Sequence, residues 1–176
     1  MIFTPTPIAG AYVIDVEMHE DERGWFARTF CADEFRNHGL NAALAQCSLS
    51  YNRRRGTLRG MHYQAAPHEE AKLIRCTRGI IYDVIIDLRA KSGSMGRWFG
   101  IELDANTHRE IYVPEGCAHG FETLSDDVEV LYQMSEAHHP ELARVIAWND
   151  PSFGVRWPLP PVEMSKRDRH APGYAG

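Results

Sequence analysis

The chain has 176 residues, 44% of them hydrophobic, which is enough for one domain with a full core and few for two. We therefore expect a single domain over residues 1–176. The formal net charge of -5 argues against a general binder of nucleic acids or membrane surfaces, because both functions need a basic excess.

Cysteine usage and the N-terminal segment bear on the compartment. The four cysteines are widely spaced and form no C-x-x-C pair, and residues 1–10 lack a basic region followed by an apolar run. No apolar run approaches the roughly 20 residues of a membrane-spanning helix. We expect a soluble, cytoplasmic protein with reduced thiols and no membrane partner.

The first predicted element is a short peripheral helix at residues 32–39, ADEFRNHG, with Asp33 and Glu34 in its first turn and Gly39 as its stop. From about residue 45 to 148, short alternating runs separated by glycine, proline and aspartate predict strands. Six such runs are residues 72–78, 80–89, 97–103, 109–114, 119–124 and 128–135. Their spacing predicts an all-β fold, a two-sheet barrel or sandwich.

Two segments qualify this picture. In residues 80–89, IIYDVIIDLR, alternation gives one apolar face and one mixed face that carries Asp83 and Asp87. After residue 150 the chain is rich in proline and aromatic residues, which indicates an irregular C-terminal arm packed over the barrel.

Residues 59–64, RGMHYQ, put a histidine in the middle of a strand. Alternation places His62 and Gln64 on one face and Arg59 on the other. A site that uses both Arg59 and His62 therefore needs a bulge or kink at Gly60, where glycine tolerates one. A lone strand histidine is more often a hydrogen-bonded core residue, so a role for His62 needs support from other residues.

Three more polar residues stand out in the strands. Lys72 shares a face with Ile74 and Cys76 and points inward if the alternation holds, although burying an ammonium is costly and a strand-end lysine often reaches water. Tyr132 points into an apolar interior, so its hydroxyl needs a partner or a task. His119 follows a turn with a proline and two glycines nearby, which we expect to aim its side chain at the mouth of the barrel.

The segment G-x-L-R-G-M-H-Y-Q with Glu70 and Gly79, and P-E-G-x-A-H-G-F at residues 114–121, resemble the two halves of a cupin motif. In metal-binding cupins the first half carries two histidines one residue apart. Here Gln64 stands in the place of the second, and an amide is a poor replacement for imidazole on a transition metal. We therefore expect no metal and no cofactor.

Among cupins the chain resembles the dTDP-4-dehydrorhamnose 3,5-epimerase family, from ERGWF at residues 22–26 to KRD at 166–168. The most specific matches are RGMHYQ, AKLIR, VPEGCAHGF, the tyrosine in LYQMSE and the stretch WNDPSFGVRWP. The resemblance implies a cupin-type jelly roll with short peripheral helices, a homodimer, and chemistry without a metal. It implies that His62 is a general base assisted by Asp168 and that Tyr132 is a general acid. The positions that it implies for binding the nucleotide sugar are Arg23, Gln46, Arg59, Lys72 and His119, to which we add Arg167 beside Asp168.

Departures from the family pattern lie around the nucleotide. Arg28 replaces a usual glutamate, Ser48 ends a segment where the family has Q-x-N, and His138 aligns with a tyrosine that stacks on thymine, while Ala143 aligns with a glutamate near the sugar. We therefore count Arg28 and His138 among the candidate substrate-binding residues and expect no strong preference for dTDP over UDP, CDP or GDP. The arginines at residues 53–55 we interpret as a solvated hairpin tip.

Chemical logic supports the same assignment. Inverting a carbon next to a ketone needs a base, an acid on the opposite face and a partner for the enolate oxygen. His62 oriented by Asp168 suits the first task, Tyr132 the second and Lys72 the third. The leading hypothesis is a metal-independent epimerase acting at C3, C5 or both of a nucleotide-linked 4-keto-6-deoxyhexose in deoxysugar biosynthesis. Two alternatives stay open: a ketoisomerase that moves the keto group between C3 and C4, and a cupin that binds a sugar without catalysis.

Overall fold

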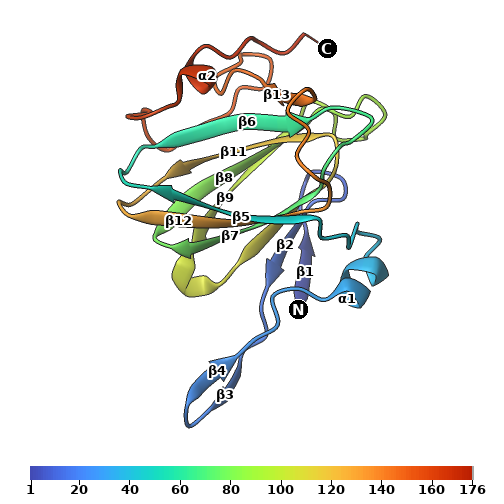
Figure 1. Ribbon diagram of the computed structural model, residues 1–176, viewed down its shortest axis with the longest axis vertical. Helices are drawn as coiled ribbons and strands as arrows, with labels where there is room; N and C mark the ends of the chain where they lie inside the picture. Colours follow the sequence, from blue (N-terminus) through green and yellow to red (C-terminus); the bar gives the residue numbers. More distant parts are fainter. Residues whose placement is uncertain (176) are drawn as a thin grey trace.

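The computed structural model describes residues 1–175 and contains two facing β-sheets, a projecting hairpin and short helices (Figure 1). The six-stranded sheet contains, from edge to edge, β1 (Ile2–Pro5), β2 (Tyr12–Asp15), β10 (Glu110–Val113), β7 (Lys72–Arg78), β12 (Val128–Met134) and β5 (Gln46–Asn52). The five-stranded sheet contains β13 (Ala143–Val145), β6 (Leu58–Gln64), β11 (Cys117–Thr123), β8 (Ile80–Asp87) and β9 (Trp98–Asp104). The hairpin and helices are β3 (His19–Asp21), β4 (Gly24–Phe26), α1 (Ala32–Asn37), η1 (Ala105–Thr107) and α2 (Lys166–Arg169).

The main core lies between the two sheets. Alternate residues of both sheets meet there, among them Ile74 and Val130 from the six-stranded sheet and Ile81, Ile85 and Phe121 from the five-stranded sheet. Each of these side chains is no more than 1% exposed. Burial of a side chain of this size contributes about 1.5–3 kcal/mol, so this layer holds the sheets together and fixes which strand faces the interior.

The segment after β13 covers the outer face of the five-stranded sheet (Figure 1, top). Phe153, Val155 and Trp157 from this segment pack against Val84 and Ile86 of β8. The apolar face of β8 therefore lies under the C-terminal arm, and the mixed face that carries Asp83 points between the sheets. The irregular arm expected from the sequence is confirmed.

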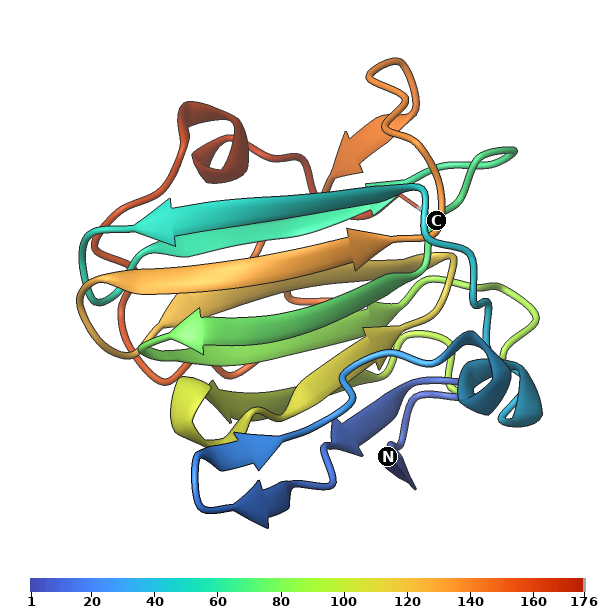
Figure 2. The ribbon, with the colours of Figure 1, turned by 60° about the horizontal axis from the view of Figure 1, so that its bottom comes forward.

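A second small core lies on the outer face of the six-stranded sheet. The short helix α1 (Figure 2) buries Phe35 there against Ile14 and Tyr112. Gly39 follows the helix with φ of +71°, a conformation that glycine adopts without strain, so the predicted helix and its stop are confirmed.

The expected all-β, cupin-like jelly roll is confirmed, but the strand inventory was incomplete. The strands β1 to β4 have three or four residues each, and most of their residues are exposed or half-buried. Such segments lack the alternation that reveals a strand in a sequence. Within residues 1–175, no helix is long and apolar enough to cross a bilayer.

Candidate active site

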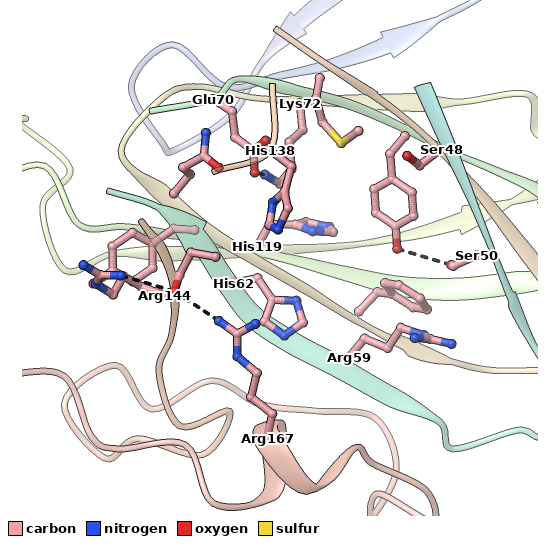
Figure 3. Close-up of a pocket in the computed structure, with 16 residues that line it drawn as sticks. Ser48, Ser50, Arg59, His62, Glu70, Lys72, His119, His138, Arg144 and Arg167 are labelled. Carbon is pink, nitrogen blue, oxygen red and sulfur yellow. Dashed lines mark hydrogen bonds and ion pairs between the residues drawn. The ribbon is translucent and has the colours of Figure 1, made fainter. Parts of the chain in front are cut away.

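A pocket of about 320 Å³ opens between the two sheets (Figure 3). One wall is the six-stranded sheet, the other is the five-stranded sheet, and α2 of the C-terminal arm lies at its rim. The lining residues that bear on function are Ser48, Ser50, Arg59, His62, Glu70, Lys72, His119, Phe121, Tyr132, His138, Ala143, Arg144 and Arg167. Seven of these were expected from the sequence to be catalytic or to bind substrate.

A kink at Gly60 brings Arg59 and His62 into one pocket. The pairing of β6 with β11 shifts register between His119 and Phe121, beside Gly60. Gly60 has φ of +137°, and a Cβ at this position would stand 2.6 Å from the Gly120 Cα. Only glycine therefore fits here, and the kink expected from the sequence is present.

His62 makes a hydrogen bond to a buried carboxylate. Its Nε2 lies 2.7 Å from Oδ1 of Asp168, whose side chain is 5% exposed against 41% for His62. Burial disfavours the charged form of Asp168, but hydrogen bonds from His62, Ser165 and the Gly60 backbone keep its pKa below the ordinary value. An ionised carboxylate only accepts hydrogen bonds, so Nε2 carries the proton and Nδ1 keeps its lone pair.

Tyr132 enters the pocket from the opposite sheet. Its ring packs against the main core, and its hydroxyl lies 3.4 Å from Oγ of Ser50 on the neighbouring strand β5. Burial raises the pKa of this phenol, which the Ser50 hydroxyl opposes only in part. The Tyr132 hydroxyl therefore keeps its proton at neutral pH.

Two further ion pairs involve residues that line the pocket. Lys72 is 8% exposed and contacts Glu70, and burial lowers the pKa of its ammonium while Glu70 acts in the opposite direction. His119 is 4% exposed, and its Nε2 lies 2.8 Å from Oδ2 of the fully buried Asp83. The inward orientation of Lys72 is thus observed, whereas His119 lies inside the barrel and opposite His62 in the strand register, not at its mouth as expected.

The outer part of the pocket is basic. Arg59 donates from Nε to Oδ1 of Asn52 at 2.7 Å, and Arg167 donates to the carbonyl of Ala143 at 3.1 Å. Arg144 and His138 complete this region. Gln46 lies beside it, where its Oε1 accepts a hydrogen bond from the His138 backbone at 2.9 Å. An otherwise acidic protein therefore gathers positive charge at the pocket entrance.

Three of the expected substrate-binding residues do not line the pocket: Gln46 lies beside it, and Arg23 and Arg28 lie on the N-terminal segment. Arg23 stands at the turn of the β3–β4 hairpin with its side chain 90% exposed and paired with Asp21. Arg28 lies on the same N-terminal segment, near Glu34 at 3.5 Å. Figure 1 shows this hairpin projecting away from the sheets, on the side opposite the C-terminal arm. The arginines at residues 53–55 are exposed at the turn between β5 and β6, in agreement with a solvated tip.

Sequence reasoning missed Ser50 and Arg144, which line the pocket, and Asp83, which pairs with the pocket residue His119. Asp83 was noted only as part of a mixed strand face, although an aspartate between Ile81 and Ile85 signals a buried carboxylate once that face is known to be internal. Ser50 and Arg144 gave no signal, because serine on a strand and arginine near a strand end are common on surfaces.

The jelly-roll pocket has a histidine–aspartate pair on one side, a protonated tyrosine on the other and a basic rim. This arrangement is that of an enzyme that moves protons on an anionic substrate. The family model described as dTDP-4-dehydrorhamnose 3,5-epimerase matches residues 5–175. The dTDP-4-dehydrorhamnose 3,5-epimerase of Methanothermobacter thermautotrophicus is 42% identical over 171 residues, which cover 96% of this chain and 91% of that protein.

Solved structures agree with this match. The dTDP-4-dehydrorhamnose 3,5-epimerase of Elizabethkingia anophelis superposes with a TM-score of 0.96 at 34% identity, covering 99% of this chain and 96% of that one. A 3'-monoepimerase of Streptomyces bikiniensis in complex with dTDP-quinovose superposes with a TM-score of 0.87 at 32% identity, covering 96% and 86%. The chain belongs to the dTDP-4-dehydrorhamnose 3,5-epimerase family, a family of nucleotide-sugar epimerases of the isomerase class.

Proposed function

We propose that this protein inverts C3, C5 or both of a nucleotide-linked 4-keto-6-deoxyhexose, without a catalytic metal. The observation that carries the proposal is the His62–Asp168 hydrogen bond of 2.7 Å on one side of a pocket whose other side presents the Tyr132 hydroxyl. A sugar ring between the two sheets would then have a base on one face and an acid on the other.

The first step removes the proton from the carbon next to the ketone. His62 takes it on Nδ1, because Nε2 is occupied by Asp168. The negative charge of Asp168 stabilises the imidazolium that forms and holds the ring in its orientation. A positioned general base of this kind typically contributes a factor of about 10²–10⁴ in rate.

The resulting enolate carries its charge on the C4 oxygen. Lys72 and His119 line the pocket, and the Lys72 ammonium is a donor that can face this oxygen. Removal of one such donor typically costs about 3 kcal/mol in the barrier. Tyr132 then donates its proton to the opposite face of the carbon, which inverts the centre.

The basic rim suits the diphosphate of the substrate. Arginine forks match phosphate oxygens, and Arg59, Arg144 and Arg167 all line the pocket. Ser48 and His138, where this chain departs from its relatives, line the same pocket. We therefore retain the expectation that dTDP is not bound tenfold tighter, about 1.4 kcal/mol, than UDP, CDP or GDP.

Incubation with a panel of nucleotide 4-keto-6-deoxysugars in deuterium oxide tests the function. We expect deuterium at C3, C5 or both of at least one substrate, together with inversion visible by NMR. Product with the keto group at C3 would instead identify a ketoisomerase. Binding without exchange in every member of the panel would identify a non-catalytic sugar-binding protein.

The homodimer is also part of this proposal. Strand β5 is an open edge of the six-stranded sheet and exposes Leu49 at 62%, and the hairpin exposes Trp25 at 49% and Phe26 at 70%. Apolar groups gathered on one edge and one projecting hairpin are typical of an interface. A second copy on this surface would place Arg23 near the partner's chain.

The four cysteines are free thiols, which fits a reducing cytoplasmic setting.

A further inference from the structure

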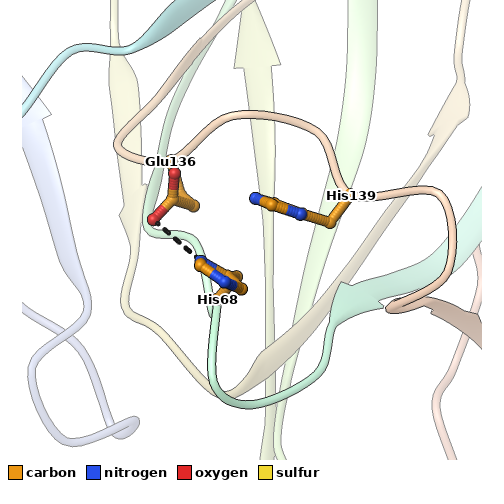
Figure 4. Close-up of side chains that lie close together, drawn as sticks. All are labelled: His68, Glu136 and His139. Atoms are coloured by element: carbon orange, nitrogen blue, oxygen red, sulfur yellow. Dashed lines mark ion pairs between the residues drawn. The ribbon is translucent and has the colours of Figure 1, made fainter.

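Three potential metal ligands from two loops meet beside the pocket. His68 lies in the loop between β6 and β7, and Glu136 and His139 lie in the loop between β12 and β13 (Figure 4). One ligand atom from each residue lies within 4.8 Å of those of the other two. The side chains are half-buried, at 43%, 38% and 29% exposure.

Glu136 and His139 are each held with one ligand atom free. Oε1 of Glu136 accepts a hydrogen bond from the Ala137 backbone at 2.7 Å, while Oε2 faces Nδ1 of His68 at 3.5 Å. Nδ1 of His139 lies 3.1 Å from Glu141 and leaves Nε2 for another partner. A carboxylate behind a histidine fixes its tautomer and orientation, and metal-binding histidines have this support almost always.

The backbone beneath these residues is fixed by one buried amide. Gln64, which is 3% exposed, donates from Nε2 to the carbonyls of His68 at 2.6 Å and Ala137 at 3.0 Å. Its Oε1 accepts from the His139 backbone at 2.8 Å. Gln64 therefore holds both loops in register, so their side chains meet with little further loss of chain entropy.

We propose that His68, Glu136 and His139 form a binding site for one Zn²⁺ ion that joins the two loops. Two imidazole nitrogens and a carboxylate oxygen, with water in the fourth position, are a ligand set that Zn²⁺ accepts. The sequence led us to expect no metal because only the cupin position was considered, and there Gln64 interrupts the ligand set. In the proposed site Gln64 supports the ligands and is not one of them.

The bound geometry requires a small movement. Tetrahedral Zn²⁺ with bonds of about 2.0–2.1 Å needs ligand atoms roughly 3.3 Å apart, closer than the limit of 4.8 Å in this structure. The rings of His68 and His139 stack with centroids 4.0 Å apart and planes at 14°, so one ring must turn to point its lone pair at a shared ion. His68 has the room to turn, because its ring is the more exposed of the two. Within the described part of the chain, no carboxylate lies behind the far side of this ring.

The site lies outside the catalytic pocket but is connected to it. None of its three ligands lines that pocket, whereas His138, between Glu136 and His139, does. Bound Zn²⁺ would hold the loop that carries His138 at the pocket entrance.

Calorimetric titration of the chelator-treated full-length protein with ZnCl₂ at pH 7.5 tests this proposal. We expect one ion per chain with a dissociation constant of about 10 μM or lower. The substitutions His68→Gln and His139→Gln should each weaken binding at least tenfold, and Glu141→Gln should weaken it by about 10–100-fold through loss of its support for His139. His19→Gln, at an exposed histidine on β3, serves as the matched control and should bind as the parent does.

A second readout separates loss of the site from loss of the fold. Zn²⁺ should raise the thermal midpoint of the parent and of His19→Gln but not that of His139→Gln, since only ligands that bind the folded state stabilise it. The metal-free midpoints of all variants should agree. Two results would overturn the proposal. One is the absence of saturable Zn²⁺ binding below 1 mM in the parent, and the other is an affinity of His68→Gln and His139→Gln equal to that of the parent.

Discussion

In the proposed mechanism, Asp168 decides which nitrogen of His62 acts as the base. The carboxylate lies 2.7 Å from Nε2, and hydrogen bonds from three groups favour its ionised form over the desolvation that opposes it. The lone pair on Nδ1 is thereby left for the substrate. The proposed catalytic pair comes from β6 and α2, two elements about a hundred residues apart in the chain, because the C-terminal arm folds back over the sheet.

Replacement of Asp168 by asparagine tests this arrangement. Asp168→Asn retains the shape but removes the charge that stabilises the imidazolium, so kcat should fall by about 10²–10⁴-fold while KM changes little. The lowered pKa of Asp168 also contributes stability that is present above its ordinary value of 3.8 and lost as the pH falls through the folded-state value. Thermal midpoints of parent and variant should therefore differ at pH 7 and converge in acid. Asp33→Asn, on the exposed face of α1, is the control; equal kcat in Asp168→Asn and the parent would contradict the assignment.

Strand alternation was sufficient to orient some site residues and not others. Lys72 and Tyr132 lie in strands whose alternate residues form one clearly apolar face. Their inward orientation could therefore be predicted from the two-residue period of a strand. Asp83 lies in β8, both faces of which are buried, and a single strand cannot show which face lies between the sheets. His119 was placed at the barrel mouth because the predicted strand began at residue 119, whereas β11 begins at Cys117 and carries His119 inside the barrel.

At the scale of elements, the kink in β6 brings Arg59 and His62 of one strand into the same pocket, where we propose that they bind phosphate and act as the base. Gly60→Ala should destabilise the fold by about 1–3 kcal/mol, since alanine disfavours this φ and its Cβ would meet the Gly120 backbone at 2.6 Å. Gly93→Ala is the matched control, because a Cβ there meets nothing within 4 Å. Thermal unfolding measures both. Equal midpoints for the two variants would show that β6 accommodates a side chain at the kink.

The six-stranded sheet carries a buried carboxyl group that should make stability depend on pH. Glu110 is 1% exposed, its Oε2 has no hydrogen-bond partner, and burial raises its pKa from 4.5 to about 8, although Arg75 lies 3.6 Å away and opposes this. Between these two values the folded state holds a proton that the unfolded state has lost, so the free energy of unfolding falls as the pH rises.

Glu110→Gln should remove this dependence. The amide is neutral at every pH, so the variant should match the parent near pH 5 and exceed it in thermal midpoint at pH 9. Glu102→Gln, at an exposed position of β9, should change neither value. A difference between Glu110→Gln and the parent that stays constant from pH 5 to pH 9 would mean that Glu110 is ionised throughout, paired with Arg75.

The N-terminal strands could not be predicted from alternation in the sequence. The hairpin β3–β4 is exposed over all six of its strand residues, so it has no buried face to impose a period on its sequence. The position of this hairpin depends on contacts with other parts of the protein, and the sequence of a single strand does not reveal those contacts. The core strands β7, β8 and β12 were predictable because each packs against the main core over seven or eight residues.

At the scale of the whole molecule, charge and association act together. The chain carries a net charge of -5, but Arg59, Arg144 and Arg167 line one pocket, so in the proposed function a diphosphate would be drawn to one place on a surface that otherwise repels it. The expected substrate-binding residues Arg23 and Arg28 stand apart from this pocket. A second copy is the simplest way for a projecting hairpin to serve a pocket.

Light scattering during gel filtration tests the dimer. We expect a mass twice the 20.0 kDa of one chain at micromolar concentration. Leu49→Arg places a charge in the middle of the exposed edge strand and should yield monomers, whereas Met95→Arg, on the β8–β9 loop, should not. A parent protein that elutes as a monomer would contradict the interface.

The division of labour between His62 and Tyr132 is the central claim, and simultaneous measurement of deuterium exchange and inversion tests it most directly. His62→Asn should abolish both, because no enolate forms. Tyr132→Phe keeps the ring and its packing but removes the acidic hydroxyl, so it should still exchange deuterium with retention, returned by His62 from its own side, while inversion falls by about 10²-fold or more. If Tyr132→Phe loses exchange as completely as His62→Asn, the tyrosine is required for enolisation itself and its assignment as the opposite-face acid is wrong.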